Sequence, residues 1–165
     1  MKNYAEFYNK LTKTFQDKPA AIRSLQVINS LLTKVMYLVY PLLLIHLFIN
    51  TPDKLPIFIL IPGLSFILVS LGRHLLNAPR PYETWNITPL IPKDTKGHSF
   101  PSRHVFSASI ISVAVLTQSS FLGVILLILS LVIAFCRVLG GVHYPHDVAA
   151  GYLIGLICGF LLFLF

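Results

Sequence analysis

Five long apolar runs fill most of the chain after residue 30, and they limit what it can fold into more than any other feature. They cover residues 31–49, 55–71, 105–117, 121–136 and 148–165. A helix needs about 17–25 residues to cross the hydrocarbon core of a membrane, because each residue adds ~1.5 Å to its length. The third and fourth runs reach this length only with their flanking residues. The pattern therefore predicts membrane-spanning helices.

Composition argues against the alternative, that these runs are helices buried in a soluble protein. Only 12% of the 165 residues are charged and 55% are hydrophobic, whereas a soluble domain carries charges at about 25% of its positions. Five apolar helices would leave no amphipathic helix to cover them. In the last run, Gly151, Gly155 and Gly159 recur every four residues, which is typical of a helix-packing face. We therefore predict an all-α fold, a polytopic membrane helix bundle with five spanning helices and one further helix at the N-terminus.

The first 30 residues follow a different pattern. Apolar residues recur at helical spacing with lysines between them, which predicts an amphipathic helix in the membrane interface; a frayed polar tail is the alternative. Asp17, followed by Pro19, indicates a break before the next helix. We expect residues 1–29 to form the interfacial helix and the start of the first long helix, and residues 30–165 to form a membrane-embedded domain. The apolar residues are Tyr4, Phe7, Tyr8, Leu11 and Phe15, and the lysines are Lys2, Lys10, Lys13 and Lys18.

Two polar loops separate the apolar runs. The longer covers residues 72–101 and contains five prolines, and the shorter lies between residues 140 and 147. A loop of about 30 residues in a compact protein is usually functional. Because helix direction alternates at each crossing, we expect both loops at the same membrane face. With the helix ends beside them, the segments of interest are 72–104 and 136–147.

Positive charge is concentrated in and beside these loops. The chain has 13 Lys and Arg against 6 Asp and Glu, and four of its five arginines are Arg73, Arg80, Arg103 and Arg137. Arginines are costly to bury at a membrane boundary unless anions neutralise them. Their planar donor groups suit phosphate oxygens, so we expect a bound phosphate. The alternative is that each arginine reaches the phosphate of a separate lipid. This would explain one arginine, but it explains four of them poorly.

Two histidines and an aspartate accompany the arginines. His143 and Asp147 are four residues apart, which places them on one side of a helical turn, where a carboxylate can bind one imidazole nitrogen and make the other more basic. His104 opens the third run beside Ser102, where helix N-terminal amides point toward a bound anion. A metal site formed by His104, His143 and His146 is the alternative, but the nearby arginines would repel a divalent cation.

The order and spacing of these residues resemble the three motifs of the type 2 phosphatidic acid phosphatase superfamily. The motifs of that family read Lys-x6-Arg-Pro, Pro-Ser-Gly-His and Ser-Arg-x5-His-x3-Asp. Three motifs in this order form a specific pattern, and the match spans residues 73–147. This chain has Arg73-x6-Arg80-Pro81, then Pro101-Ser102-Arg103-His104, then Cys136-Arg137-x5-His143-x3-Asp147.

The resemblance implies a membrane lipid phosphatase that uses no metal or other cofactor. His143 would attack phosphorus to form a phosphohistidine, Asp147 would hold His143, and His104 would protonate the leaving group and then activate water. The substrate would be a lipid phosphate or diphosphate of the phosphatidate, phosphatidylglycerophosphate or polyprenyl diphosphate class. The resemblance also implies phosphate binding by Arg73, Arg80, Ser102 and Arg137.

This chain departs from the family motifs at three positions. Arg73 replaces lysine and keeps the charge, and Cys136 replaces serine and loses a hydroxyl group. Arg103 replaces glycine, so its Cβ would hinder the approach of the backbone to phosphate, while its guanidinium group would be able to hold a second phosphate. We therefore expect some capacity for diphosphate substrates.

Another class of function stays open, a non-catalytic lipid-phosphate binding or transport protein that keeps the same site. Nucleic acid is not an expected partner, because the basic residues lie among apolar runs. The pattern indicates no oligomeric state. We expect a multi-pass protein of the cell membrane.

The membrane side of the site is predicted from charge. With five spans, the N-terminus and the loops share one face, which then carries seven lysines and arginines outside the site against Lys54 opposite. The positive-inside rule makes such a face cytoplasmic, although many relatives in the resembled family are understood to work at the outer face with six spans. The seven residues are Lys2, Lys10, Lys13, Lys18, Arg23, Lys93 and Lys96.

Overall fold

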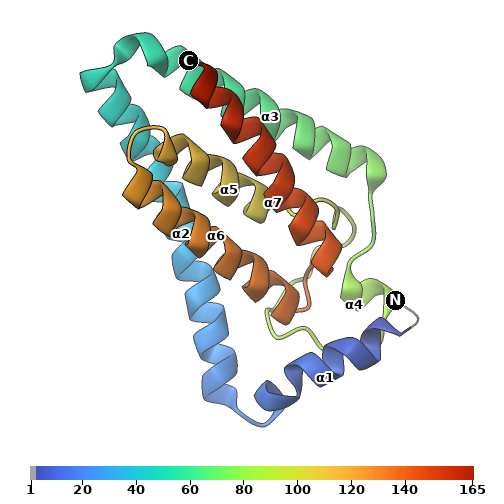
Figure 1. Ribbon diagram of the computed structural model, residues 1–165. Coiled ribbons are helices and arrows are strands. Elements are labelled where there is room, and N and C mark those ends of the chain that lie inside the picture. Colours follow the sequence, from blue (N-terminus) through green and yellow to red (C-terminus); the bar gives the residue numbers. More distant parts are fainter. Residues whose placement is uncertain (1–2) are drawn as a thin grey trace.

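The computed structural model describes residues 3–165, so Lys2 lies outside the described part of the chain. Residues 3–165 form helices joined by loops and turns, without a β-strand among them (Figure 1). The elements are α1 (Tyr4–Gln16), α2 (Pro19–Asn50), η1 (Pro52–Lys54), α3 (Leu55–Leu76), α4 (Pro81–Thr84), α5 (Arg103–Leu116), α6 (Ser120–Leu139), α7 (Pro145–Phe160) and η2 (Leu161–Leu164).

The long helices are built to face lipid. Four segments are long and apolar enough to cross a membrane, and they contain α2, α3, α6 and α7. Their outward side chains are apolar: Leu68 is 67% exposed and Phe121 is 76% exposed, which suits contact with lipid chains and not with water. The prediction of an all-α polytopic membrane bundle is confirmed.

The third apolar run, residues 105–117, forms α5, which is shorter than the other helices of the bundle. It has 14 residues, or about 21 Å at ~1.5 Å per residue, against a hydrocarbon core of about 30 Å. It packs on α6 and α7 and also contacts α2 and α3 (Figure 1), and ten of its 14 residues are buried. Of the five expected spans, four therefore have the length to cross a membrane, and the remaining one, formed by the third run, is a short central helix.

Glycines bring α7 close to α5. Gly151, Gly155 and Gly159 are buried on one face of α7. A Cβ at Gly151 would lie 2.5 Å from the carbonyl oxygen of Ser102, and one at Gly155 would lie 2.6 Å from that of Phe106. A larger residue would push the two backbones apart. The packing face indicated by the glycine spacing is confirmed, and it places the N-terminal ends of α5 and α7 side by side.

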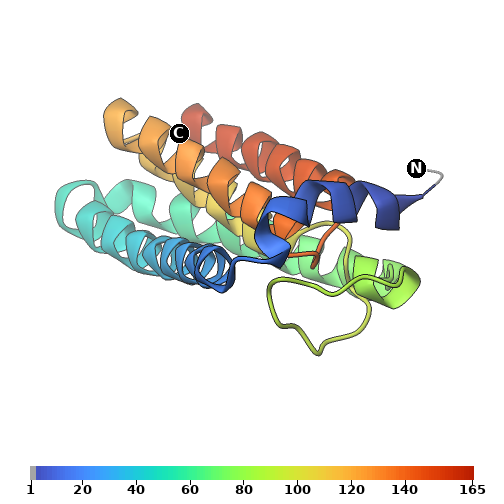
Figure 2. The same cartoon turned by 90° about the horizontal axis from the view of Figure 1, so that it is seen from below.

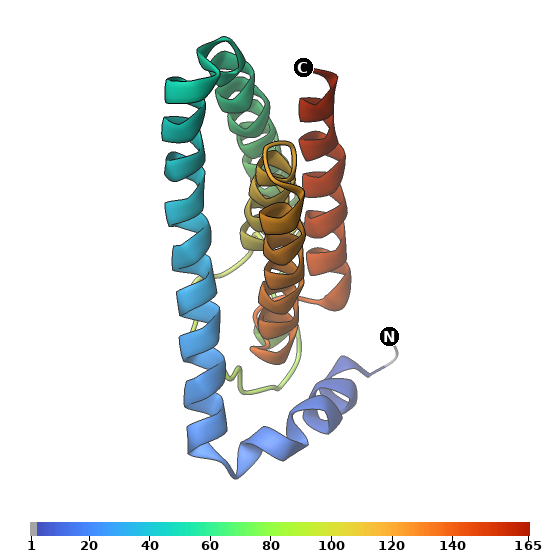
Figure 3. The ribbon, with the colours of Figure 1, turned by 60° about the vertical axis from the view of Figure 1, so that its left-hand side comes forward.

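Helix α1 lies across the end of the bundle that carries the loops (Figures 1 and 3). It is capped at Asp17, and α2 begins at Pro19, as the sequence predicts. Tyr4 and Tyr8 are 2% and 1% exposed, and Lys10 is exposed. The aromatic residues Tyr4 and Tyr8 therefore pack on the protein itself and not on lipid. Contact of α1 with the membrane interface stays a prediction.

Helix α2 is longer than a hydrocarbon core is thick. Its 32 residues extend about 48 Å at ~1.5 Å per residue, against about 30 Å for the core. Its first turns lie near α1, at the lower end of the bundle in Figure 3. There the side-chain amide of Gln26 donates a hydrogen bond of 2.7 Å to the carbonyl oxygen of Leu90. The start of α2 thus supports the proline-rich loop.

Both polar loops lie at the same end of the bundle, as predicted (Figure 2). Several hydrogen bonds join them. The backbone N–H of Ser102 donates to the carbonyl oxygen of Asp147 at 2.9 Å, and Nη1 of Arg80 donates to the carbonyl oxygen of Val142, also at 2.9 Å. Residues from α3, α5, α6 and both loops are brought together in this way.

Candidate active site

A polar cavity of about 300 Å³ lies where the two loops meet the ends of α3, α5 and α6. It brings together six of the eight residues predicted for the site. The other two, Ser102 and Asp147, do not line it and lie in the surrounding structure. The six lining residues are Arg73, Arg80, Arg103, His104, Arg137 and His143.

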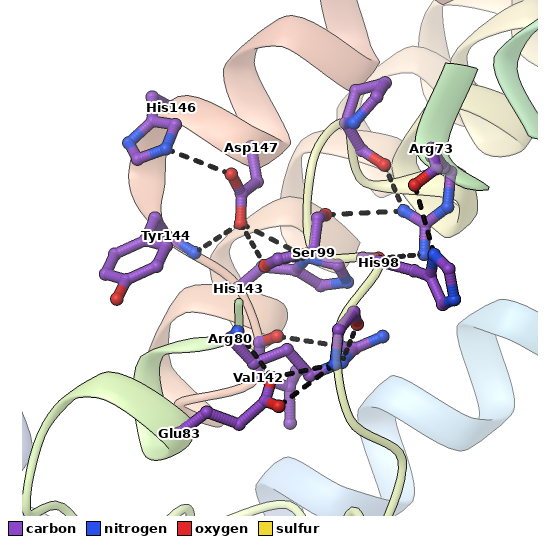
Figure 4. A network of polar contacts seen from close by, with 12 residues as sticks. Arg73, Arg80, Glu83, His98, Ser99, Val142, His143, Tyr144, His146 and Asp147 are labelled. Carbon is purple, nitrogen blue, oxygen red and sulfur yellow. Dashed lines mark hydrogen bonds and ion pairs between the residues drawn. The ribbon is translucent and has the colours of Figure 1, made fainter. Parts of the chain in front are cut away.

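Arg73 is held by backbone carbonyl groups. It stands in the last turn of α3 and is buried. Its guanidinium group donates hydrogen bonds to the carbonyl oxygens of His98, Ser99 and Pro101, the one to Ser99 at 3.3 Å (Figure 4). The loop that follows α3 therefore folds back over Arg73 and fixes the direction of its side chain.

Arg80 connects the two loops. Its Nε donates to the carbonyl oxygen of Gly97 at 3.1 Å, and its Nη1 donates to that of Val142 at 2.9 Å (Figure 4). Glu83, the acidic residue nearest to it in sequence, accepts instead from the backbone N–H groups of Arg80, at 2.7 Å, and Gly97, at 2.9 Å. The carboxylate of Glu83 thus shapes the loop and leaves the guanidinium group without an ion pair.

Arg137 completes a set of three buried arginines. It lies in the last turn of α6 and is 5% exposed, and its Nε has no hydrogen-bond partner among residues 3–165. Within the described chain, no carboxylate oxygen lies within 4.0 Å of Arg73, Arg80 or Arg137. Buried charges are normally paired. Three unpaired guanidinium groups around one cavity therefore indicate an anion-binding site.

His143 is held against a network centred on one oxygen of Asp147. Oδ2 of Asp147 lies 3.5 Å from Nδ1 of His143, accepts the backbone N–H of Tyr144 at 3.0 Å and accepts the hydroxyl of Ser99 (Figure 4). His143 precedes α7, and Asp147 is in the first turn of that helix. The expected proximity is present, but it comes from a loop meeting a helix N-terminus and not from a helical turn that holds both residues.

Burial keeps His143 neutral. Its side chain is 3% exposed, and burial lowers the pKa of His143 to about 4, with the charges of Arg80 and Arg137 acting in the same direction and Asp147 opposing them. Near neutral pH the imidazole is therefore uncharged. A neutral imidazole with one nitrogen turned toward a carboxylate has a lone pair available on the other nitrogen.

The second motif supplies one cavity histidine and one supporting serine. His104 is in the first turn of α5 and lines the cavity. Ser102 is fully buried, and its hydroxyl has no partner among residues 3–165. Because its backbone N–H is bonded to Asp147, Ser102 joins the two motif loops from behind the cavity.

Arg103, the residue that replaces the glycine of the family motif, lies at the edge of the cavity. Its side chain is exposed, and its Cζ lies 5.4 Å from the centre of the Phe66 ring, an arrangement typical of cation–π contact. It therefore stands between the polar cavity and the apolar helix surface.

The structure adds functional candidates that sequence reasoning missed. Ser99 is fully buried, and its hydroxyl contacts both His143, at 3.4 Å from Nδ1, and Asp147. At the rim, the rings of His74 and His98 stack with their centres 5.3 Å apart. The only feature of the sequence that pointed to Ser99 was its position two residues before Pro101, where the second motif begins. Among residues 3–165, no group of three or more His, Cys, Asp or Glu residues is arranged to hold a metal ion.

The fold and the cavity define a class of protein, an integral-membrane helix bundle with an arginine-rich anion site and a His–Asp pair at one end. The family model of the PAP2 superfamily matches residues 54–165. The chain belongs to this superfamily and is a membrane lipid phosphatase. The resemblance read from the three motifs is confirmed.

Relatives of known name agree with this assignment. The chain is 34% identical over 158 residues to the undecaprenyl-diphosphatase BcrC of Bacillus subtilis (strain 168), covering 88% of this chain and 80% of that protein. LpxE of Aquifex aeolicus has a similar structure, with a TM-score of 0.75, 29% identity and coverage of 97% of this chain and 94% of that one. A PAP2-type phosphatidylglycerolphosphate phosphatase from Bacillus subtilis shares the fold, with a TM-score of 0.58, 20% identity and coverage of 94% and 90%.

Proposed function

We propose that this protein hydrolyses a lipid diphosphate or phosphate through a phosphohistidine formed on His143. The observation that carries the proposal is the combination of three buried guanidinium groups that lack a counter-anion with a buried His143 on the same cavity. Phosphoryl transfer depends mostly on positioning and charge stabilisation. A site of this composition supplies both.

In the first step, Nε2 of His143 attacks phosphorus. The contact between Nδ1 and Asp147 favours the tautomer that carries its proton on Nδ1, which leaves the lone pair on Nε2. As the N–P bond forms, the bond from phosphorus to the leaving oxygen breaks. Burial, with the charges of Arg137 and Lys93 acting in the same direction, lowers the pKa of His104 to about 3 before substrate binds. The negative charge of a bound phosphate opposes this lowering, so His104 takes up a proton with the substrate and gives it to the leaving oxygen.

The second step releases phosphate. His104, now neutral, accepts a proton from a water molecule, whose oxygen attacks the phosphohistidine. The N–P bond breaks, its electron pair returns to Nε2, and free phosphate leaves. Both histidines are then in their starting protonation states.

The arginines stabilise the negative charge that the phosphoryl oxygens carry through both steps. Arg73 and Arg80 are held by carbonyl groups of the loops, so their donors are already oriented before substrate binds. Such preorganised donors cost little reorganisation during the reaction. Arg137 contributes the third guanidinium group from α6.

A second cavity is placed to hold the lipid chain. It has a volume of about 240 Å³, lies between α2, α3 and α5, and is lined by apolar residues that include Tyr37, Phe66 and Phe106. Phe66 contacts Arg103, which lines the polar cavity, so the two cavities meet at this pair. The lipid chain would remain among apolar side chains while its phosphate enters the arginine-rich cavity.

The charge of the polar cavity favours a diphosphate. Besides the three buried arginines, Lys93, Lys96 and Arg103 line it, which provides donors for a second phosphate group. Burial lowers the pKa of Lys93, with the nearby arginines acting in the same direction, so an added anion would favour its charged form. The name of the relative BcrC, an undecaprenyl-diphosphatase, supports the same substrate class.

Arg103→Gly tests this substrate preference by restoring the residue of the family motif. We expect the ratio of diphosphate to monophosphate hydrolysis, measured with one prenyl chain carrying either group, to fall by about tenfold, since a hydrogen bond to a charged group contributes about 1.5–3 kcal/mol. Arg103→Lys, which keeps the charge, should retain most of the ratio. An unchanged ratio in Arg103→Gly would contradict a role for Arg103 in holding a second phosphate.

Phosphate release by the detergent-purified protein tests the catalytic proposal itself. A panel of phosphatidate, phosphatidylglycerophosphate and a polyprenyl diphosphate identifies the substrate class. We expect His143→Ala to lower turnover by at least about 10³-fold, and His46→Ala to leave it unchanged, because His46 is exposed on α2 and bonded to Asn50. Binding of these lipids by the wild-type protein without turnover would instead support a non-catalytic binding or transport function.

A further inference from the structure

Helix α1 lies outside the part of the chain that matches the family model, which begins at residue 54, yet it contacts the active-site loops. Tyr4, Tyr8 and Thr12 are one turn apart from each other and are all at most 2% exposed. Figure 1 shows α1 crossing the loop end of the bundle. Such deep burial is unusual for side chains of a peripheral helix. It indicates that α1 packs closely on the active-site loops.

Tyr8 is bonded to both loops through its hydroxyl group. The hydroxyl donates to the carbonyl oxygen of Leu139 at 3.1 Å and accepts the backbone N–H of Leu90 at 3.3 Å. It also lies against Gly141, where an added Cβ would come within 2.7 Å of the hydroxyl oxygen and where φ is +70°. The turn that Tyr8 holds leads from Arg137 to His143.

Tyr4 reaches the other end of the same turn with its ring. Its centre lies 4.8 Å from that of Tyr144, in an edge-to-face arrangement. Tyr144 is the residue after His143, and its backbone N–H donates to Oδ2 of Asp147. The hydroxyl of Tyr4 has no partner among residues 3–165, so Tyr4 acts on Tyr144 through ring packing.

We propose that α1 positions the catalytic loop, with the Tyr8 hydroxyl and the Tyr4 ring holding residues 139–144 so that His143 stays aligned with Asp147. Tyr4 and Tyr8 are positioning residues, because they act through Leu139, Gly141 and Tyr144. This role rests on the proposed function of His143. Arg73 is held differently, by carbonyl groups of residues 98–101, which α1 does not bond. Arg80 is held partly by the carbonyl oxygen of Val142, inside the segment that α1 holds.

Loss of the hydroxyl group alone should impair the enzyme at Tyr8 but not at Tyr4. Tyr8→Phe removes every hydrogen bond of the hydroxyl group, including the one to the carbonyl oxygen of Thr88, and is expected to lower kcat by about tenfold. Tyr4→Phe keeps the ring and should stay within twofold of wild-type kcat, whereas Tyr4→Ala should fall by about tenfold or more. In Tyr8→Phe, the inhibition constant of inorganic phosphate should change by less than kcat does, because Arg73 is held by carbonyl groups of residues 98–101, which α1 does not bond.

Tyr152→Phe is the matched control. Tyr152 also donates to a backbone carbonyl, that of Leu127 at 3.5 Å, but it joins α7 to α6 away from the cavity. Its kcat should match that of the wild-type protein. A Tyr8→Phe kcat within twofold of the control, or a Tyr4→Phe as impaired as Tyr4→Ala, would overturn the proposal. A kcat loss in Tyr8→Phe matched by an equal weakening of phosphate inhibition would also overturn it, since that indicates general disruption.

Hydrogen exchange tests the same positioning without reference to catalysis. In detergent, the amides of Val142, His143 and Tyr144 should exchange faster in Tyr8→Phe than in Tyr152→Phe or wild type. Equal exchange in all three proteins would refute the positioning role. A wild-type protein that releases no phosphate, by contrast, would refute the proposed function, and the exchange result would still decide what α1 does to the loop.

Discussion

Asp147 contacts the proposed nucleophile through one of its two carboxylate oxygens. Oδ2 accepts hydrogen bonds from the Ser99 hydroxyl and the Tyr144 backbone N–H and lies 3.5 Å from Nδ1 of His143. Oδ1 makes no hydrogen bond within the described chain, although Nε2 of the exposed His146 lies 3.1 Å away. Oδ2 is therefore held by three groups, whereas the buried Oδ1 faces only His146. The carboxylate can orient His143 without lining the cavity.

The lowered pKa of His143 leads to a prediction about pH. Only the neutral imidazole can attack phosphorus, so activity is lost as the pH falls through the pKa of His143. Because burial lowers this pKa to about 4, the acid limb of kcat/KM, which reports the free enzyme, should lie well below the ordinary histidine value of about 6.5. The measurement is a pH series of initial rates with a detergent-dispersed prenyl diphosphate.

Asp147→Asn tests in which direction the pKa of His143 moves when the carboxylate is removed. The substitution removes the negative charge and the acceptor that raise the pKa of His143, so the acid limb should move to still lower pH while kcat falls by at least about 10²-fold. An acid limb at or above 6.5 in the wild-type protein would contradict the assignment of His143 as the nucleophile.

At the scale of elements, the contact between α5 and α7 decides where the motif residues meet. The second motif starts α5 and the third ends just inside α7. Both helices must therefore begin side by side, and the glycine face of α7 allows this because backbone atoms of α5 occupy the space where a Cβ would be. Helix packing in membranes commonly uses small residues in this way.

Gly155→Ala should separate the two helices and lower both stability and activity. The new Cβ would lie 2.6 Å from the carbonyl oxygen of Phe106 and 1.9 Å from the hydroxyl of Ser109; the hydroxyl can rotate away, but the backbone carbonyl cannot. Overpacking of this kind costs about 1–3 kcal/mol. Thermal unfolding in detergent and kcat measure the two effects.

Gly72→Ala is the control for this substitution. Gly72 is also in a helix, but an added Cβ would meet no atom within 4 Å. At this position, alanine should leave the free energy of unfolding unchanged or raise it by up to about 1 kcal/mol. Equal melting temperatures for Gly155→Ala and Gly72→Ala would show that the glycine face has no role in holding α5 against α7.

At the scale of the whole molecule, the active site and α1 share one end of the bundle, and η1 lies at the other. The shared end carries Lys10, Lys13, Lys18, Lys93 and Lys96, and Lys54 lies in η1. This arrangement fits the charge argument that the site faces the cytoplasm. The membrane side itself stays a prediction.

Cysteine labelling in intact cells tests the membrane side. Asp94 is exposed in the long loop and Asp53 is exposed in η1. If the site is cytoplasmic, a membrane-impermeant thiol reagent should label Asp53→Cys in intact cells and label Asp94→Cys only after permeabilisation. The wild-type protein, with Cys136 buried and Cys158 partly buried, measures the background. Ready labelling of Asp94→Cys in intact cells would place the site outside.

Much of the fold and most of the cavity could be predicted from local patterns. Apolar runs indicate the helices, Pro19 marks the start of α2, and the spacing of the arginines and histidines points to the residues that line the cavity. The exceptions depend on distant parts of the chain. Ser102, for example, does not line the cavity, and its backbone N–H donates to the carbonyl oxygen of Asp147; its contact with phosphate stays a prediction.

The sequence by itself determined the membrane class, the helices and the chemical type of the site, because hydrophobicity, helix breaks and motif spacing are properties of neighbouring residues. Only the tertiary structure decided that Ser99 contacts the His143–Asp147 pair and that Tyr8 binds Leu139, a residue 131 positions away. It also decided that α1 turns Tyr4 and Tyr8 toward the protein's own loops. Such contacts depend on how the helices pack together, and no local pattern encodes which loop backbone a buried hydroxyl will meet.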